Sequence, residues 1–175
     1  MRSVLLLFTL CLTTAKHQPL KVLDPALVKP APKVVVLVFL NTECPVSQQY
    51  TRRLAELARQ FEAGGVRFEA VYPSPTDVPG TIRAFHQTYA LPFRGLPDPA
   101  HRQVRRYHAQ TTPEVVVLNA ARQVVYRGAV DDWYVSLGHH RPAPTQHFLR
   151  DALDATLTNR PILMSRTQAV GCMIE

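Results

Sequence analysis

One junction in this sequence constrains its fold more than any other feature. A continuous apolar run rich in β-branched residues spans positions 34–40, which is typical of a strand buried on both faces of a sheet. After a short polar turn, apolar residues recur at spacings of three and four until Gly64-Gly65 ends the pattern. These apolar residues are Val46, Tyr50, Leu54, Leu57 and Phe61. The junction predicts a central strand that passes directly into an amphipathic helix, with Cys44 in the turn between them.

The rest of the chain continues to alternate between strand and helix patterns. The predicted elements are, in order, a strand over 66–72, a helix through Ile82, Phe85 and Tyr89, an extended connector at 91–98, a short helix near 99–107, two antiparallel strands over 112–118 and 123–127, a polar loop at 131–144 and a last helix from Phe148 to Leu157. This order predicts an α/β fold in which helices flank a central mixed sheet, within a single domain over 34–160.

Residues 1–15 have the pattern of a signal peptide, with one basic residue, an apolar run and three small residues. The run is shorter than the roughly 18 apolar residues that a membrane-spanning helix needs. We therefore expect an exported chain, periplasmic or extracellular, with no membrane span after cleavage; an uncleaved anchor is the alternative. Residues 16–33 contain four prolines and predict an irregular linker or arm. Residues 161–175 predict a C-terminal tail.

The formal net charge is +7, and the basic residues are scattered. They form short doublets such as Arg52-Arg53 and Arg105-Arg106 rather than a long basic run. This pattern is more typical of a solvated basic surface than of a nucleic-acid-binding face. No nucleic-acid partner is expected.

The chain has three cysteines, and Cys11 lies inside the predicted signal peptide. Cleavage after Ala15 would leave Cys44 and Cys172 in a compartment where disulfides persist. These two thiols permit one bridge within the chain. A tail cysteine that is unpaired or bonded to another molecule is the alternative for Cys172.

Cys44 is the strongest candidate for a reactive group. The thiolate is the nucleophilic form of cysteine, and free N–H groups at a helix start stabilise its charge. Pro45 and Ser47 are expected to support this helix start. Glu43 would oppose the thiolate if charged, or relay a proton if partly buried, and Arg127 would favour the thiolate if it pointed inward. The alternative is a buried, inert cysteine.

The order of elements resembles the thioredoxin fold, which keeps its chemistry at the first strand-to-helix turn. Cys44-Pro-Val-Ser47 and Thr112-Pro113 sharpen this resemblance, because Pro113 lies just before a strand, where thioredoxin-like proteins have a cis proline. Together with the segments 68–74 and 125–129, they make the chain similar to the redoxin or peroxiredoxin-like (AhpC/TSA-type) branch of the thioredoxin-like superfamily. The resemblance covers about 34–157.

The resemblance implies a catalytic Cys44, with Cys172 as the second catalytic thiol because Ser47 stands where dithiol thioredoxins carry theirs. It also implies a cis Pro113 that holds Thr112 near Cys44 to bind an extended substrate; an ordinary trans proline is the alternative. The implied partners are a disulfide-bearing protein or a peroxide and an unknown thiol reductant, with no cofactor. Typical peroxiredoxins have threonine or serine three residues before the cysteine and proline seven before it, where this chain has Asn41 and Leu37.

Two readings of function follow. The first is an exported thiol-disulfide oxidoreductase or peroxiredoxin-like redox protein that uses the Cys44 thiolate. The second is a non-enzymatic thioredoxin-fold module that binds a partner or carries copper, with ligands among His139, His140 and His147. Copper carriers of this fold use two cysteines four residues apart, and Gln48 occupies the second position here. Surface histidines are therefore favoured, and no metal site is expected.

Overall fold

The computed structural model describes residues 31–175, and the predicted signal peptide and most of the predicted arm lie outside them. In chain order the elements are β1 (Val34–Phe39), α1 (Pro45–Glu62), β2 (Val66–Tyr72), α2 (Pro79–Thr88), β3 (Arg94–Pro97), α3 (Arg102–Tyr107), β4 (Thr111–Thr112), β5 (Glu114–Leu118), β6 (Val124–Gly128), β7 (Tyr134–Ser136), β8 (His139–His140), α4 (Phe148–Leu157) and β9 (Cys172–Met173).

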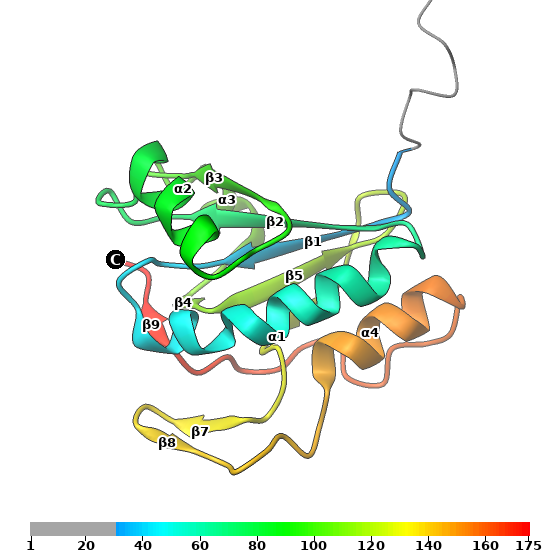
Figure 1. Cartoon of the computed structure of the whole chain (residues 1–175). Coiled ribbons are helices and arrows are strands. Elements are labelled where there is room, and N and C mark those ends of the chain that lie inside the picture. Colours follow the sequence, from blue (N-terminus) through cyan, green and yellow to red (C-terminus); the bar gives the residue numbers. More distant parts are fainter. Residues whose placement is uncertain (1–30) are drawn as a thin grey trace, which may run out of the picture. The chain divides into compact units, whose positions relative to one another are not determined.

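A five-stranded sheet in the order β3-β2-β1-β5-β6 forms the centre of the described chain (Figure 1). β1 and β2 run parallel, as do β2 and β3, whereas β5 is antiparallel to both β1 and β6. The predicted α/β fold with a mixed sheet flanked by helices is therefore confirmed. The two short pairs β4-β9 and β7-β8 lie outside this sheet.

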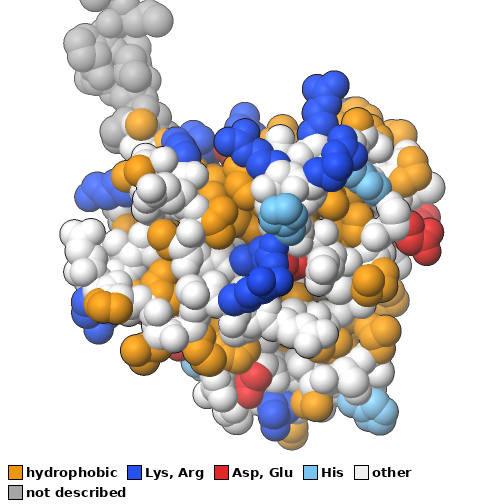
Figure 2. Space-filling view, turned by 180° about the vertical axis from the view of Figure 1, so that it is seen from behind, with side chains coloured by type: hydrophobic (Ala, Val, Ile, Leu, Met, Phe, Trp, Pro, Cys, Tyr) orange, Lys and Arg blue, Asp and Glu red, His pale blue; other side chains and the backbone are white. Residues whose placement is uncertain are grey.

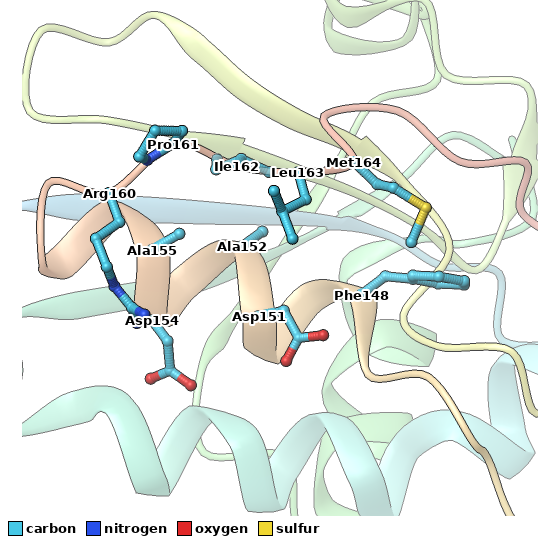
Figure 3. Close-up of a pocket in the computed structure, with 10 residues that line it drawn as sticks. All are labelled: Phe148, Asp151, Ala152, Asp154, Ala155, Arg160, Pro161, Ile162, Leu163 and Met164. Carbon is cyan, nitrogen blue, oxygen red and sulfur yellow. The ribbon is translucent and has the colours of Figure 1, made fainter.

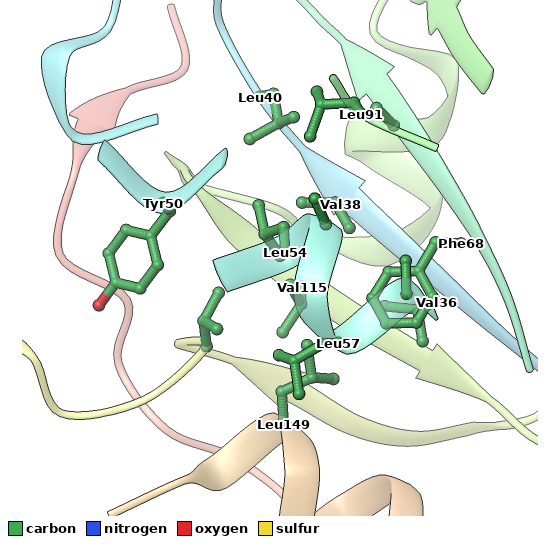
Figure 4. Close-up of a cluster of buried hydrophobic side chains, with 14 of the residues drawn as sticks. Val36, Val38, Leu40, Tyr50, Leu54, Leu57, Phe68, Leu91, Val115 and Leu149 are labelled. Carbon is green, nitrogen blue, oxygen red and sulfur yellow. The ribbon is translucent and has the colours of Figure 1, made fainter. Parts of the chain in front are cut away.

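Alternate residues of β1 face the larger of two apolar clusters. Val36 and Val38 lie in the same cluster as Leu54 of α1 and Leu149 of α4, and Figure 4 shows these side chains between the helices and the strands. Burial of each such side chain stabilises the fold by about 1.5–3 kcal/mol. Ile82 and Phe85 of α2 belong to this cluster too. The helix periodicity in the sequence therefore identified the core correctly.

The other face of the sheet is covered by a smaller cluster. Val35, Leu37 and Phe39 of β1 lie there, and Val104 and Tyr107 of α3 pack against them. Ile174 from the tail packs against the same cluster. β1 is thus buried on both faces, as its continuous apolar run predicted.

The helix α1 begins and ends where the sequence predicted. Pro45 occupies its first turn, where a missing N–H costs no helical hydrogen bond. At the other end the N–H of Gly65 donates to the carbonyl of Glu62 at 3.0 Å, and Gly65 has a φ of 84°, which glycine adopts easily. The strand, turn and helix that carry Cys44 are therefore fixed at both ends.

Three segments differ from their predicted description. The connector at 91–98 contains β3, which pairs with β2 from Glu69↔Arg94 to Tyr72↔Pro97. The loop at 131–144 contains the β7-β8 hairpin, and the tail at 161–175 contains β9. These strands have short or mostly exposed sequences, so that no alternation of apolar residues marked them.

Basic side chains on the side of the molecule drawn in Figure 2 lie spread over the surface, with uncharged surface between many of them. Within residues 31–175, no helix combines the length and apolar character needed to cross a membrane.

Candidate active site

Cys44 lies at the N-terminal end of α1, as predicted. It is the N-cap residue, and its carbonyl accepts the first helical hydrogen bond from the N–H of Gln48 at 3.0 Å. Its first turn carries no acidic residue, so that the positive end of the helix dipole faces the sulfur without an opposing charge from the helix. Only 2% of Cys44 is exposed. The site is a buried sulfur at a helix start.

The sulfur of Cys44 forms a disulfide with Cys172, from which it is 128 residues distant in sequence. The two Cα atoms are 6.1 Å apart, within the range that a disulfide spans without backbone movement. The sequence left open whether Cys172 is unpaired, bonded to another molecule or bonded to Cys44. The structure has the bond to Cys44. Ser47 is fully buried beside this bridge's helix turn and provides no second thiol.

The cis peptide bond between Thr112 and Pro113 stands next to the disulfide. The carbonyl oxygen of Thr112 lies 3.2 Å from Sγ of Cys44. This sulfur has no hydrogen in the disulfide, so the contact becomes a hydrogen bond only when Cys44 is a thiol. The structure thus brings together three of the residues that the sequence singled out, Cys44, Thr112 and Pro113.

The tail reaches the site as a strand. β9 pairs antiparallel with β4, with Thr112 opposite Cys172 and Thr111 opposite Met173. The hydroxyl of Thr112 donates to the carbonyl of Cys172 at 3.4 Å, and the N–H of Ile174 donates to the carbonyl of Gln110 at 3.0 Å. In Figure 1 the tail returns across the molecule, so that β9 lies beside β4 near the start of α1.

Glu114 and Arg127 hold the segment that carries β4. One carboxylate oxygen of Glu114 accepts from the N–H groups of Gln110 and Thr111, at 2.7 and 3.2 Å. Arg127 lies 3.7 Å from the other oxygen and donates to the carbonyls of Tyr107 and His108. Arg127 is therefore engaged with this segment, and the prediction that it lowers the pKa of Cys44 gains no support.

The turn before Cys44 is closed by its own polar groups. The N–H of Cys44 donates to the carbonyl of Asn41 at 3.2 Å, and the N–H of Asn41 donates to the hydroxyl of Ser47 at 3.4 Å. Ser47 thus contacts the turn that it was predicted to support. Glu43 is exposed, so it does not meet the condition of partial burial under which it would relay a proton.

A buried carboxyl group at this turn was missed at the level of sequence. Both the N–H and the hydroxyl of Thr42 donate to Oδ1 of Asp77, at 3.3 and 2.5 Å. Asp77 is 2% exposed, and among residues 31–175 its Oδ2 has no hydrogen-bond partner. Burial raises the pKa of Asp77, although the hydrogen bonds from Thr42 oppose the change. Its sequence neighbourhood, rich in proline and serine, indicated turn and capping residues before a helix, whereas α2 has Val78 as its N-cap and no side-chain cap.

Asp131 anchors the loop that follows β6 to α1. It accepts from the hydroxyl of Tyr50 at 2.8 Å and from the guanidinium of Arg53, which lies over the ring of Trp133 at 5.0 Å. Burial, and then the charge of Asp131, raise the pKa of Tyr50. These contacts hold the loop against α1.

The histidines lie apart from the disulfide. His139 and His140 form the exposed strand β8, and His140 stacks against Trp133 and Tyr134. Within the described part of the chain, no three histidine, cysteine or acidic side chains gather as a metal site. Cys44, which the copper-carrying alternative needs as a ligand, is bonded to Cys172.

A pocket of about 480 Å³ is separate from this site. It lies between α4 and the segment from Arg160 to Met164. Figure 3 shows Phe148, Ala152, Leu163 and Met164 around it. None of the residues that line it belongs to the disulfide site.

Solved structures similar to this chain have the thioredoxin fold. The crystal structure of an uncharacterized conserved protein from Geobacillus kaustophilus matches with a TM-score of 0.73 and 27% identity, covering 82% of this chain and 77% of that chain. A hypothetical protein from Sinorhizobium meliloti 1021 matches with a TM-score of 0.70 and 22% identity, covering 82% and 80%. A structure described as thiol:disulfide interchange protein DsbE from Chlorobium tepidum matches with a TM-score of 0.57 and 20% identity, covering 73% and 82%. The predicted thioredoxin fold is confirmed.

Two further comparisons concern sequence. The sequence model of the AhpC/TSA family matches residues 11–127, which is more than half of the chain. No curated protein matches the sequence. The family match bears out the resemblance to the peroxiredoxin-like branch, and it includes Cys44 and the Thr112-Pro113 bond while ending before Cys172.

Proposed function

The chain belongs to the AhpC/TSA family, and from this premise we propose that it is an exported thiol-disulfide oxidoreductase that cycles Cys44 and Cys172 between dithiol and disulfide. One observation carries the proposal: a cysteine at a helix start is joined to a second cysteine beside the Thr112-Pro113 bond. The dithiol and disulfide forms of this cysteine pair differ by two electrons, and thiol-disulfide exchange transfers two electrons, so the proposed reaction uses no cofactor.

In the reducing direction, the Cys44 thiolate attacks one sulfur of a substrate disulfide. A bond forms between Cys44 and that sulfur, the substrate S–S bond breaks, and the released thiolate takes up a proton. The Cys172 thiolate then attacks Sγ of Cys44, forms the Cys44–Cys172 bond and releases the second substrate thiol. The substrate gains two electrons, the chain loses two, and a thiol reductant restores the dithiol.

Cys44 is the better nucleophile of the pair because of its place in the fold. The helix start favours its thiolate, and the N–H groups of the first turn have no helical partner. Cys172 lies in a strand of two residues near the C-terminus and does not itself begin a helix. We therefore assign the first attack to Cys44 and the resolving step to Cys172.

Peroxide is a second candidate substrate, because of the family. The Cys44 thiolate would attack one peroxide oxygen, the O–O bond would break, and a sulfenic acid and water would form after protonation. Cys172 would then attack this sulfur, releasing a second water as the disulfide forms. The hydroxyl of Thr42 donates a hydrogen bond to Asp77, and Asn41 stands where the family has its peroxide-binding hydroxyl. Disulfide exchange is therefore the favoured reaction.

Export is proposed from the sequence of residues 1–15, and a stable disulfide fits an oxidising compartment. In such a compartment the partners would be a disulfide-bearing protein and a thiol reductant. A non-enzymatic binding or copper-carrying role is the alternative.

The test compares thiol exchange in four chains that all carry Cys11→Ser, so that only two thiols count. Each reduced chain is mixed with glutathione disulfide, the reaction is quenched with acid, and the mass of the intact chain is measured by mass spectrometry. We expect the parent chain to lose two thiols and retain no glutathione, and Cys172→Ser to retain one glutathione on Cys44. Cys44→Ser should react at least about tenfold more slowly than Cys172→Ser. The double variant provides the background.

The same chains separate the alternatives. If Cys44 and Cys172 react at equal rates, with an ordinary thiol pKa of about 8.5, the oxidoreductase proposal is contradicted and the non-enzymatic role is favoured. Replacing glutathione disulfide by hydrogen peroxide tests the second candidate. Loss of peroxide that depends on Cys44 would support it, and equal loss with Cys44→Ser would remove it.

A further inference from the structure

The tail occupies the edge of β4 in the manner of a bound peptide. Cys172 stands opposite Thr112 in an antiparallel pair, and its sulfur is bonded to Cys44. This is the place that a substrate strand must occupy to present its own cysteine to Cys44, since an extended peptide pairs with an exposed strand edge through main-chain hydrogen bonds. Substrate and tail therefore compete for one surface.

We infer that β4 is a docking edge for an extended, cysteine-bearing segment of another polypeptide, with the sequence pattern glycine, cysteine, any residue, apolar residue, and that the tail 171–174 is its built-in substitute. This inference rests on the proposed exchange at Cys44. The pattern is that of the tail itself, whose contacts define what the edge accepts at each position.

The position before the cysteine accepts only glycine. A Cβ atom added to Gly171 would meet the carbonyl oxygen and carbon of Thr112 and the nitrogen of Pro113. These are backbone atoms beside the disulfide, so that they cannot turn aside as a flexible side chain would. A substrate with any larger residue before its cysteine is held away from Cys44.

The positions after the cysteine differ from each other. Met173 is 70% exposed, so the side chain at this position makes little contact and any residue fits. Ile174 packs against the smaller apolar cluster, and its N–H donates to the carbonyl of Gln110. An apolar side chain is therefore favoured two positions after the cysteine.

Opening of the disulfide is what frees the edge. An incoming thiolate attacks Sγ of Cys44, forms the new disulfide and breaks the bond to Cys172, whose thiolate takes up a proton. The tail is then held by a strand of two residues, and the incoming segment takes its place on β4. The oxidant in this step is the chain's own disulfide, and the substrate cysteine loses one electron to it in forming the mixed disulfide.

The test uses the full chain with Cys11→Ser and Cys172→Ser, in which Cys44 is the remaining thiol. One peptide has the sequence of residues 169–175, Ala-Val-Gly-Cys-Met-Ile-Glu, and a matched peptide has alanine in place of glycine; both carry a thionitrobenzoate leaving group on cysteine. Cys44 attacks the peptide sulfur, and the released thionitrobenzoate absorbs visible light. We expect the glycine peptide to react at least about tenfold faster.

A second variant asks whether the tail competes. Adding Gly171→Ala to the same chain prevents the tail from seating on β4, so the glycine peptide should react several-fold faster than it does without this substitution. Equal rates of the two peptides, or no gain from Gly171→Ala, would overturn the inference. Reaction with Ellman's reagent, measured on the same preparations, distinguishes failure of the proposed function from failure of the docking edge. A Cys44 that fails to react with it contradicts the proposed function, whereas a reactive Cys44 that treats the peptides alike contradicts only the docking edge.

Discussion

The turn that carries Cys44 and the tail that carries Cys172 meet in one disulfide, but the fold holds them differently. Cys44 follows a strand buried on both faces and begins a helix of 18 residues. Cys172 belongs to a strand of two residues, which within residues 31–175 pairs with β4 alone. The sulfur of Cys44 is therefore a fixed part of the core, whereas the sulfur of Cys172 can move away once the bond between them opens.

The largest loss of stability is expected from a substitution in the core beside Cys44. Leu54→Ala removes a fully buried side chain of α1 and should lower the free energy of unfolding by about 2–5 kcal/mol. Met173→Ala, on the exposed side of the tail, should change it by less than about 0.5 kcal/mol. Denaturant unfolding of both variants measures the contrast, and equal losses would mean that the tail is as firmly held as the helix.

A smaller effect is expected at the segment between the two regions. Glu114→Ala removes the acceptor for the N–H groups of Gln110 and Thr111 and leaves Arg127 without its carboxylate. We expect a loss of about 1–3 kcal/mol in the free energy of unfolding. Glu56→Ala, which removes an exposed i,i+4 ion pair with Arg52, is the matched control and should leave stability almost unchanged. A loss no larger than that of the control would show that β4 does not depend on Glu114.

A substitution in the tail is expected to change the equilibrium between disulfide and dithiol. Gly171→Ala places a Cβ against the carbonyl of Thr112, so it should shift the equilibrium between disulfide and dithiol toward the dithiol by about 5- to 100-fold. Gly80→Ala is the control, since a Cβ there comes within 4 Å of no other element among the described residues. The measurement is titration of each chain with glutathione redox buffers, and an unchanged midpoint would contradict the close packing of the tail.

The smallest effect concerns the pH dependence of the turn at Cys44. The pKa of Asp77 is raised in the fold by burial, so the protonated group is favoured there. Its contribution to stability is fully present below the unfolded pKa of about 3.9 and is lost as the pH rises through the folded pKa. Wild type should therefore lose stability relative to Asp77→Asn as the pH rises from this value. Unfolding free energies of both chains, measured across this range, should show the difference grow and then level, and a constant difference would be evidence against the raised pKa.

Local patterns were sufficient for the main elements of the fold. The apolar run of β1 and the helical spacing of α1 have their causes in neighbouring residues, and the observed bounds agree with them. β3 and the β7-β8 hairpin were not predicted, because their backbone pairs with partners while their side chains stay mostly exposed. Period-two alternation requires one buried face, and these strands have none.

The residues of the candidate site could be predicted in large part, with Cys172 implied as the second thiol by the family resemblance and its pairing left open. Cys44, Pro45 and Ser47 are adjacent in sequence, and Thr112-Pro113 could be placed near them through the family resemblance. Asp77 could not, since its contact with Thr42 joins two loops across 35 residues.

Periodicity and capping act over a few residues, so the sequence alone was enough to place a cysteine at the start of a helix after a buried strand. The pairing of Cys172 with Cys44, the contact of Gly171 with Thr112 and the position of the tail on β4 depend on the tertiary structure. These contacts join segments more than fifty residues apart, from Thr112 to Cys172 and from Cys44 to Cys172. Such contacts arise from the packing of the whole sheet and its helices, which no local pattern encodes.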